Sequence, residues 1–193
     1  MSETIVTGAS GRAIPVRGDD IDTDRIIPAR FLTRQTTDGI GECLFADWRF
    51  DKSGKPNEDF ILNQPESTDA GILVAGHNFG CGSSREHAAW SLLDYGFRAI
   101  ISTSFADIFQ NNSLKNGLIT IVVNLETHKW LLEHPATQLI VDLDNTQVCL
   151  ENGKAISFPI DSFARYCLLN GVDQLSYLLN HESEISAYEN KQQ

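Results

Sequence analysis

Residues 76–87, with the sequence GHNFGCGSSREH, form a glycine-rich segment between an apolar run and an amphipathic run. The run before it is short, unbroken and apolar, which predicts a fully buried strand over 71–76. After it, alanines and leucines recur at helical spacing, which predicts a helix over 84–95 that ends at Gly96. This arrangement indicates an α/β fold, in which ligands bind at the carboxyl ends of the strands. Because helix N-termini favour negative charge, the segment predicts an anion site.

The residues at the end of this segment allow two interpretations. Arg85 offers a forked donor that suits a carboxylate, which favours a site for a small carboxylic acid. Residues 83–86 also match a capping box, with Ser83 at the N-cap and Glu86 reaching back to it. In that second interpretation the glycines serve backbone geometry alone.

Three common glycine-rich or serine-containing motifs are excluded. No Lys-Ser or Lys-Thr pair follows the glycines, so the segment is not a Walker-type phosphate loop. A dinucleotide fingerprint would require a third glycine at position 85, where the chain has arginine. The serines are not flanked as G-x-S-x-G, which excludes a nucleophile elbow.

Composition limits the classes of partner. The chain has 193 residues and a net charge of −11, and its lysines and arginines do not cluster, which argues against nucleic-acid binding. No apolar run approaches membrane-spanning length, and the N-terminus lacks a signal-peptide core, so we expect a cytoplasmic protein with no membrane contact.

The cysteines do not have the spacing of metal ligands. Cys43, Cys81, Cys149 and Cys167 include no C-x-x-C pair, so we expect free thiols and no metal site in this chain. Three of them are expected in the core. Cys81 would be reactive if a helix N-terminus lowered the pKa of its thiol.

The remaining pattern predicts a single α/β domain over residues 1–193. It contains a polar loop over 18–59, a parallel βαβαβ centre over 71–123, and a hairpin with a helical tail over 136–193. The other expected strands are 13–16, 99–103, 119–123 and a hairpin pair at 138–143 and 147–158. The other expected helices are 105–115, starting near Ser104 and Asp107, then 126–134, and short helices within 161–189 broken at Asn170-Gly171.

Two longer stretches, GHNFGCGSSREHAAWSL and IDTDRIIPARFL, closely resemble the swivelling domain of the aconitase family. The resemblance continues through LFADWRF, DYGFRAIISTSFADIF and NGVDQLSYLL, and so covers nearly the whole chain. LFADWRF and IIPARFL are similar to the isopropylmalate branch of that family. The resemblance implies an aconitase-type swivelling β/β/α domain. It also implies part of a hydro-lyase that isomerises 2-isopropylmalate to 3-isopropylmalate through isopropylmaleate, in leucine biosynthesis.

The resemblance also implies roles for individual residues. Ser83 matches the serine that removes and returns the carbon-bound proton, and Ser84 and Arg85 match residues that bind a substrate carboxylate. Thr23 and Asp24 match a Thr-Asp pair that forms hydrogen bonds around the active site. An alternative for Asp24 is an Asx-type turn in a solvated acidic run.

The resemblance departs from aconitase just after this Thr-Asp pair. Aconitase supplies an arginine there for a third carboxylate, whereas Phe31 and Leu32 could line a pocket for an isopropyl group. Whether Arg30 or Arg34 faces the cleft stays open.

The expected partners follow from the same resemblance. No cofactor is expected in this chain, a [4Fe–4S] cluster is expected on a separate large subunit, and the ligand is a small dicarboxylate. Two alternatives remain. One is the small subunit of a sister hydro-lyase, of the homoaconitase or methylmalate/citraconate type. The other is a non-catalytic carboxylate-binding module.

Overall fold

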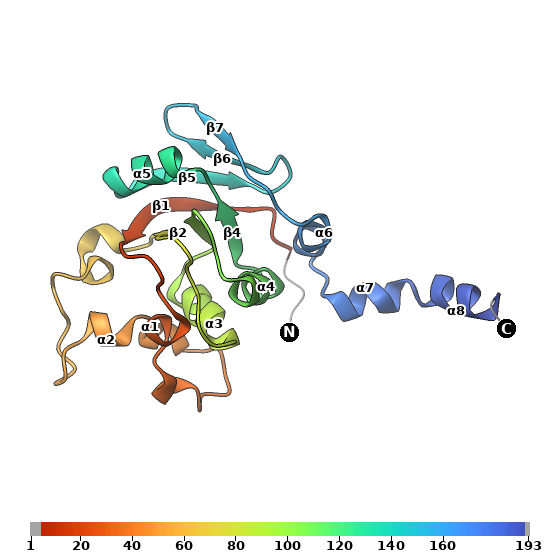
Figure 1. The fold of residues 1–193 in the computed structure, drawn as a ribbon, viewed down its shortest axis with the longest axis horizontal. Helices are drawn as coiled ribbons and strands as arrows, with labels where there is room; N and C mark the ends of the chain where they lie inside the picture. Colours follow the sequence, from red (N-terminus) through yellow and green to blue (C-terminus); the bar gives the residue numbers. More distant parts are fainter. Residues whose placement is uncertain (1–4, 192–193) are drawn as a thin grey trace.

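One seven-stranded sheet forms the centre of the molecule (Figure 1). The computed structural model describes residues 5–191. The strand order is β4-β3-β2-β1-β5-β6-β7, with β1 to β4 parallel and β5 to β7 antiparallel. The strands are β1 (Gly8–Val16), β2 (Ile72–Ala75), β3 (Ala99–Ser102), β4 (Ile119–Val122), β5 (Thr137–Asp142), β6 (Gln147–Leu150) and β7 (Ala155–Ser157). The predicted α/β fold with a parallel centre is confirmed.

The central strands are apolar on both faces because both faces are covered. In β2, Leu73 packs into one core cluster and Val74 into the other. The predicted strand ends agree with the structure to within one residue for β2, β3 and β4. β1 is longer than the expected 13–16, since residues 8–13 pair with β5 and residues 13–16 pair with β2.

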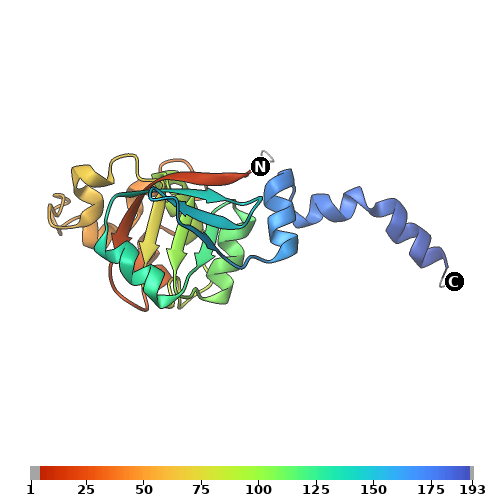
Figure 2. The ribbon, with the colours of Figure 1, turned by 90° about the horizontal axis from the view of Figure 1, so that it is seen from above.

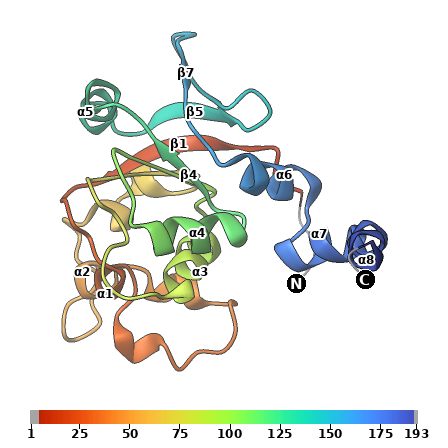
Figure 3. The same cartoon turned by 45° about the vertical axis from the view of Figure 1, so that its right-hand side comes forward.

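Helices cover the two faces separately. α3 (Glu86–Tyr95) and α4 (Asp107–Lys115) lie on one face, together with the long β1–β2 connection (Figure 1). α5 (Leu125–Glu133) lies on the other face, where β5 to β7 curl over the second core (Figure 3). α6 (Ser162–Asn170) closes one end of that core through buried Leu168.

The β1–β2 connection, predicted as a polar loop over 18–59, contains short helices and a buried segment. The α-helices are α1 (Thr23–Ile26) and α2 (Ala46–Arg49), and the 3-10 turns are η1 (Ala29–Phe31), η2 (Ile40–Cys43), η3 (Ile61–Asn63) and η4 (Pro65–Ser67). Phe45 is fully buried and packs against Trp48 and Phe60. The connection is therefore anchored to the core.

Two further predicted boundaries differ from the structure. α4 begins at Asp107 with Ala106 at its N-cap, because the Ser104 hydroxyl instead accepts a hydrogen bond from the Asn78 amide at 2.8 Å. The expected strand over 147–158 is two strands, β6 and β7. A tight turn separates them, in which the Gly153 amide donates to the Leu150 carbonyl oxygen at 2.9 Å.

The last helices project from the body of the molecule (Figures 1 and 2). α6 ends at Gly171, whose left-handed backbone (φ 63°) confirms the predicted break at Asn170-Gly171. α7 (Gln174–Asn180) and α8 (Glu182–Asn190) follow. No helix within residues 5–191 combines the length and apolar character needed to cross a membrane.

Candidate active site

Two segments far apart in the sequence run side by side at the carboxyl edge of the parallel sheet. One follows β1 and the other follows β2. The Gly80 amide donates to the Ile21 carbonyl oxygen at 2.8 Å, and the Thr23 amide donates to the Cys81 carbonyl oxygen at 2.9 Å. The fold therefore brings both motifs of the sequence to one place, where α/β proteins bind ligands.

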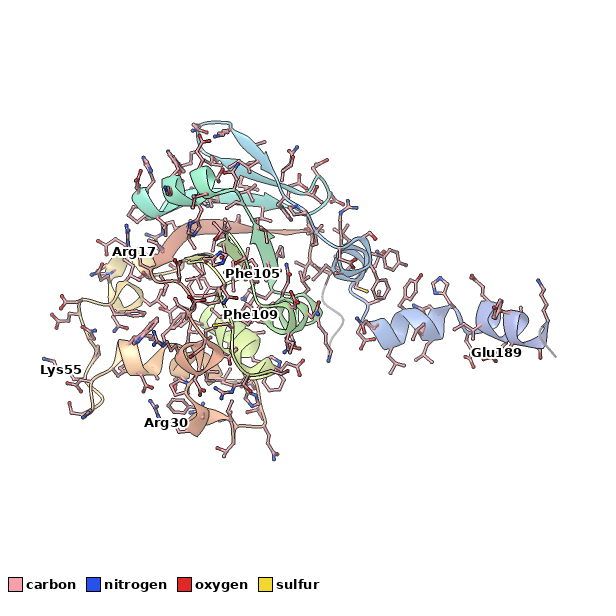
Figure 4. All side chains as sticks on the ribbon, viewed as in Figure 1. Arg17, Arg30, Lys55, Phe105, Phe109 and Glu189 are labelled. Atoms are coloured by element: carbon pink, nitrogen blue, oxygen red, sulfur yellow. The ribbon has the colours of Figure 1, made fainter. Side chains whose placement is uncertain are left out.

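Two glycines permit this close approach. A Cβ atom on Gly76 would overlap the Gly18 carbonyl oxygen. Gly80 has a left-handed backbone (φ 78°), and a Cβ atom there would overlap the Phe109 ring, which lies under the segment with Phe105 (Figure 4). A side chain at Gly76 would push the two segments apart, and one at Gly80 would push the glycine-rich segment away from α4.

The acidic run after β1 holds this arrangement together. Asp19 Oδ1 accepts the His77 amide at 2.8 Å, and Asp20 Oδ1 accepts from Asn78 Nδ2 at 2.7 Å. Asp22 caps α1 through its side chain. Asp22 therefore makes a local contact, whereas Asp19 and Asp20 fasten the glycine-rich segment.

Ser83 and Ser84 are exposed, and their hydroxyl groups form no hydrogen bond within the described part of the chain. The Thr23 hydroxyl, which is buried, donates to the Ser83 carbonyl oxygen at 3.0 Å. Ser83 is therefore fixed through its backbone, while its hydroxyl group is exposed and has no partner among the described residues.

The predicted capping box is wrong, as is the predicted start of the helix at residue 84. α3 starts at Glu86, and its N-cap, Arg85, has an extended backbone and no capping side chain. Glu86 Oε1 accepts from Asn116 Nδ2 at 2.9 Å instead of reaching back to Ser83. Because Thr23 holds the Ser83 carbonyl and Gly82 turns the chain at φ 90°, the serines lie outside the helix.

Arg85 and Asp24 form an ion pair across the two segments. Arg85 Nη2 donates to Asp24 Oδ2 at 2.8 Å, and Nη1 lies against Oδ1. The Arg85 side chain is 14% exposed and that of Asp24 is 55% exposed. This hydrogen bond lowers the pKa of Asp24 and raises that of Arg85, so both groups are charged at neutral pH.

Phe31 and Leu32, the residues expected to line an apolar pocket, lie in η1 and at its end. Phe31 is half-buried against the core and lies under the Arg30 guanidinium, 4.5 Å from it, and Leu32 follows in the same turn. Arg30 pairs with Asp47 at 2.6 Å, and Arg34 Nη1 donates to the Gly39 carbonyl oxygen. Neither arginine contacts Ser83 or Arg85 through a hydrogen bond. His87 Nε2 lies 3.0 Å from the Arg34 carbonyl oxygen and links this loop to α3.

A polar group at the end of β3 was not predicted from the sequence. His77 Nδ1 lies 2.9 Å from Ser104 Oγ and 3.2 Å from Thr103 Oγ1. Together with the Asn78–Ser104 hydrogen bond, these contacts attach the glycine-rich segment to the next strand. The signal available in the sequence was the Ser-Thr-Ser run at the end of a buried strand.

The structure corrects the expectation for Cys81. Burial and the nearby carboxylates of Asp22 and Asp20 raise the pKa of its thiol, which opposes a reactive thiolate. Cys43 is buried, while Cys149 and Cys167 are half-buried. Residues 5–191 contain no group of three or more His, Cys, Asp or Glu side chains arranged to hold a metal ion.

Comparisons with known proteins give one consistent result. Residues 3–126 match the aconitase C-terminal domain family. The chain is 56% identical over 184 residues to a 3-isopropylmalate dehydratase small subunit of Roseiflexus sp. (strain RS-1), an alignment that covers 93% of this chain and 90% of that one. It is 52% identical over 178 residues to the corresponding protein of Anaeromyxobacter dehalogenans (strain 2CP-1), which covers 92% and 93% of the two chains.

A solved structure agrees with these sequences. The crystal structure of 3-isopropylmalate dehydratase from Methanocaldococcus jannaschii superposes with a TM-score of 0.68 at 30% identity, covering 93% of this chain and 98% of that one. The fold, the two segments at its carboxyl edge and these relatives agree. The chain belongs to the family of 3-isopropylmalate dehydratase small subunits, hydro-lyase components with the fold of the aconitase C-terminal domain.

Proposed function

We propose that residues 1–193 form one swivelling domain that acts as the small subunit of 3-isopropylmalate dehydratase in leucine biosynthesis. The reaction converts 2-isopropylmalate to isopropylmaleate and water, and then adds water back with the hydroxyl on the neighbouring carbon. The observation that carries the proposal is the free Ser83 hydroxyl on a loop that also presents Arg85, held in place by Asp24. The family relationship supplies the substrate class.

Ser83 is proposed as the catalytic base. Its alkoxide takes the carbon-bound proton, the C–H electron pair forms the double bond, and the hydroxyl leaves from the adjacent carbon. In the second half, hydroxide adds to the carbon that lost its proton, and Ser83 returns the proton to the other carbon. A serine alkoxide needs a positive environment, and Arg85 at the start of α3 supplies it.

Arg85 and Ser84 are proposed to bind a substrate carboxylate. The buried stem of Arg85 fixes the direction of its planar fork, and a fork holds a carboxylate through two hydrogen bonds. Thr23 and Asp24 are proposed as positioning residues, because they hold the Ser83 backbone and the Arg85 guanidinium respectively.

Phe31 and Leu32 are proposed to line the pocket for the isopropyl group. Burying a group of that size is worth about 2 kcal/mol.

The partner is proposed to be a cluster-bearing large subunit. The four cysteines of this chain are not grouped as cluster ligands in the described residues, so the [4Fe–4S] cluster would have to be held by that partner. When bound, it supplies a Lewis acid for the departing hydroxyl.

Anaerobic reconstitution with a cluster-loaded large subunit tests the proposal. Absorbance of isopropylmaleate should appear from 3-isopropylmalate only when both chains are present. Ser83→Ala should abolish most of kcat and leave subunit association unchanged. Ser10→Ala, a change at an exposed serine of β1, is the matched control and should behave as wild type.

Other outcomes identify the alternatives. Turnover of a tricarboxylic or smaller methyl-substituted substrate, without turnover of isopropylmalate, would indicate a sister hydro-lyase. Full activity of Ser83→Ala would remove Ser83 as the base. Binding of dicarboxylates with no turnover of any substrate, beside a partner proven competent, would leave a non-catalytic module.

A further inference from the structure

The projecting C-terminal tail (residues 172–191) carries a concentration of exposed apolar side chains. Leu175, Leu178, Leu179 and Ile185 are 64%, 53%, 60% and 40% exposed. The three leucines recur at i, i+3 and i+4 in α7, which places them on one helical face. A contiguous exposed apolar face is typical of an interaction surface.

Contacts between α7 and α6 fix the direction of this apolar face. Tyr177 packs edge-on against Phe163, with ring centroids 4.9 Å apart, and against Tyr166 at 5.5 Å. His181, one turn later, packs on Tyr177 at 4.4 Å. These aromatic contacts hold one side of α7 toward α6, so the leucines on the other side face outward.

The charge of the tail restricts what can cover it. Lys191 is the one lysine or arginine in the tail. The tail also carries four carboxylates: Asp173, Glu182, Glu184 and Glu189. All four are exposed, and Glu189 lies near the end of the projecting tail (Figure 4). No ion pair found within residues 5–191 includes any of them. A fitting partner surface is apolar and bordered by lysine or arginine.

Net charge argues against a second copy of this chain as the occupant. Each copy has a net charge of −11, so tail-to-tail or tail-to-body association would bring like charges together. An anionic lipid surface would also repel the tail. The remaining partner with a basis in the family relationship is the large subunit.

We propose that α7 and α8 dock into an apolar groove bordered by basic side chains on the large subunit. This inference rests on the proposed function, because it assigns a contact surface to the partner named there. The tail then strengthens assembly without touching the reacting atoms, since it lies on α6 and Ser83 lies at the carboxyl edge of the sheet.

Paired substitutions test the docking. In Leu175→Gln/Leu179→Gln, the dissociation constant for the large subunit should rise at least about tenfold, because two buried leucines are lost. The kcat at saturating large subunit should equal that of wild type. Leu125→Gln is the matched control: Leu125 is 60% exposed, like Leu179, but lies on α5, and its dissociation constant should not change.

A charge-reversal variant tests whether the carboxylates of the tail contribute to docking. Glu182→Lys/Glu184→Lys should weaken association, and raising the salt concentration should reduce the difference from wild type. Circular dichroism of each variant checks that the fold is retained.

Each remaining outcome bears on one claim. If wild type is active and the leucine variant associates equally well, the docking inference is overturned while the proposed function stands. If light scattering shows wild-type dimers that the leucine variant converts to monomers, the occupant is a second copy and the inference is overturned. If the variant loses association as expected but wild type has no activity with a competent partner, the docking stands and the proposed function fails.

Discussion

Thr23→Val isolates the contribution of one buried hydroxyl to the active site. Thr23 is 2% exposed, and its hydroxyl donates to the Ser83 carbonyl oxygen at 3.0 Å. Valine preserves the shape and removes the donor, while the Thr23 amide can still donate to the Cys81 carbonyl oxygen. The two segments therefore stay together, and only the hydrogen bond to the Ser83 carbonyl oxygen is lost.

The expected magnitudes follow from this one hydrogen bond. A bond of this kind contributes about 1 kcal/mol, and the methyl group that replaces the hydroxyl offsets part of it, so the midpoint of thermal unfolding should fall by less than about 4 °C. If the same free energy is lost from the transition state because Ser83 is held less firmly, kcat falls about fivefold. Displacement of the reacting atom by an ångström raises the loss to about a hundredfold.

A matched substitution controls for the loss of a buried hydroxyl as such. Thr120 in β4 is 1% exposed, and its hydroxyl has no hydrogen-bond partner within residues 5–191. Thr120→Val should leave kcat unchanged and should not lower the unfolding midpoint. Kinetics of both variants with the large subunit, beside thermal unfolding of the chain, make the comparison. Wild-type kcat in Thr23→Val, or an equal loss in both variants, would refute the reasoning.

Three further predictions concern the same segments. Gly80→Ala forces a left-handed alanine against Phe109, at a cost of about 1–2 kcal/mol for the backbone and about 1–3 kcal/mol for overpacking, measured as a lower free energy of unfolding. Because Arg85 lowers the pKa of Asp24, their pair stabilises the fold above the ordinary aspartate pKa and loses this effect as the pH falls. The difference in unfolding free energy between wild type and Asp24→Asn should therefore be under about 1 kcal/mol and shrink below about pH 4. Since its surroundings raise the pKa of Cys81, alkylation of that thiol at neutral pH, followed by peptide mapping, should be slower than alkylation of free cysteine.

The parallel centre was predictable because its signals are local. Continuous apolar runs over β2, β3 and β4 can be buried only in a sheet covered on both faces, and the glycine-rich segment had to follow one of them. The first part of β1 was not predictable. Residues 8–13 gain their strand conformation by pairing with β5, about 130 residues later in the chain, and contain two glycines that weaken a local strand signal.

The two predicted site motifs come together in the structure, but their local geometry could not be predicted from the sequence. Ser83 matches a capping pattern as well as a family motif, and local sequence favours the cap. The structure decides against the cap through Thr23, a residue 60 positions away that binds the Ser83 carbonyl. In the same way, His77, Thr103 and Ser104 come together only when β2 and β3 pair.

In the role proposed for Arg85, binding of a substrate carboxylate would exchange one carboxylate, that of Asp24, for another. Asp24 is attached to the fold, so it competes at an effective concentration on the order of millimolar or higher. A free monocarboxylate such as acetate must overcome that tethered competitor with a single attachment. A ligand with a second carboxylate or an apolar group gains further contacts and can win the exchange. On this proposal the site selects ligands that make more than one contact, and small monocarboxylates such as acetate bind weakly.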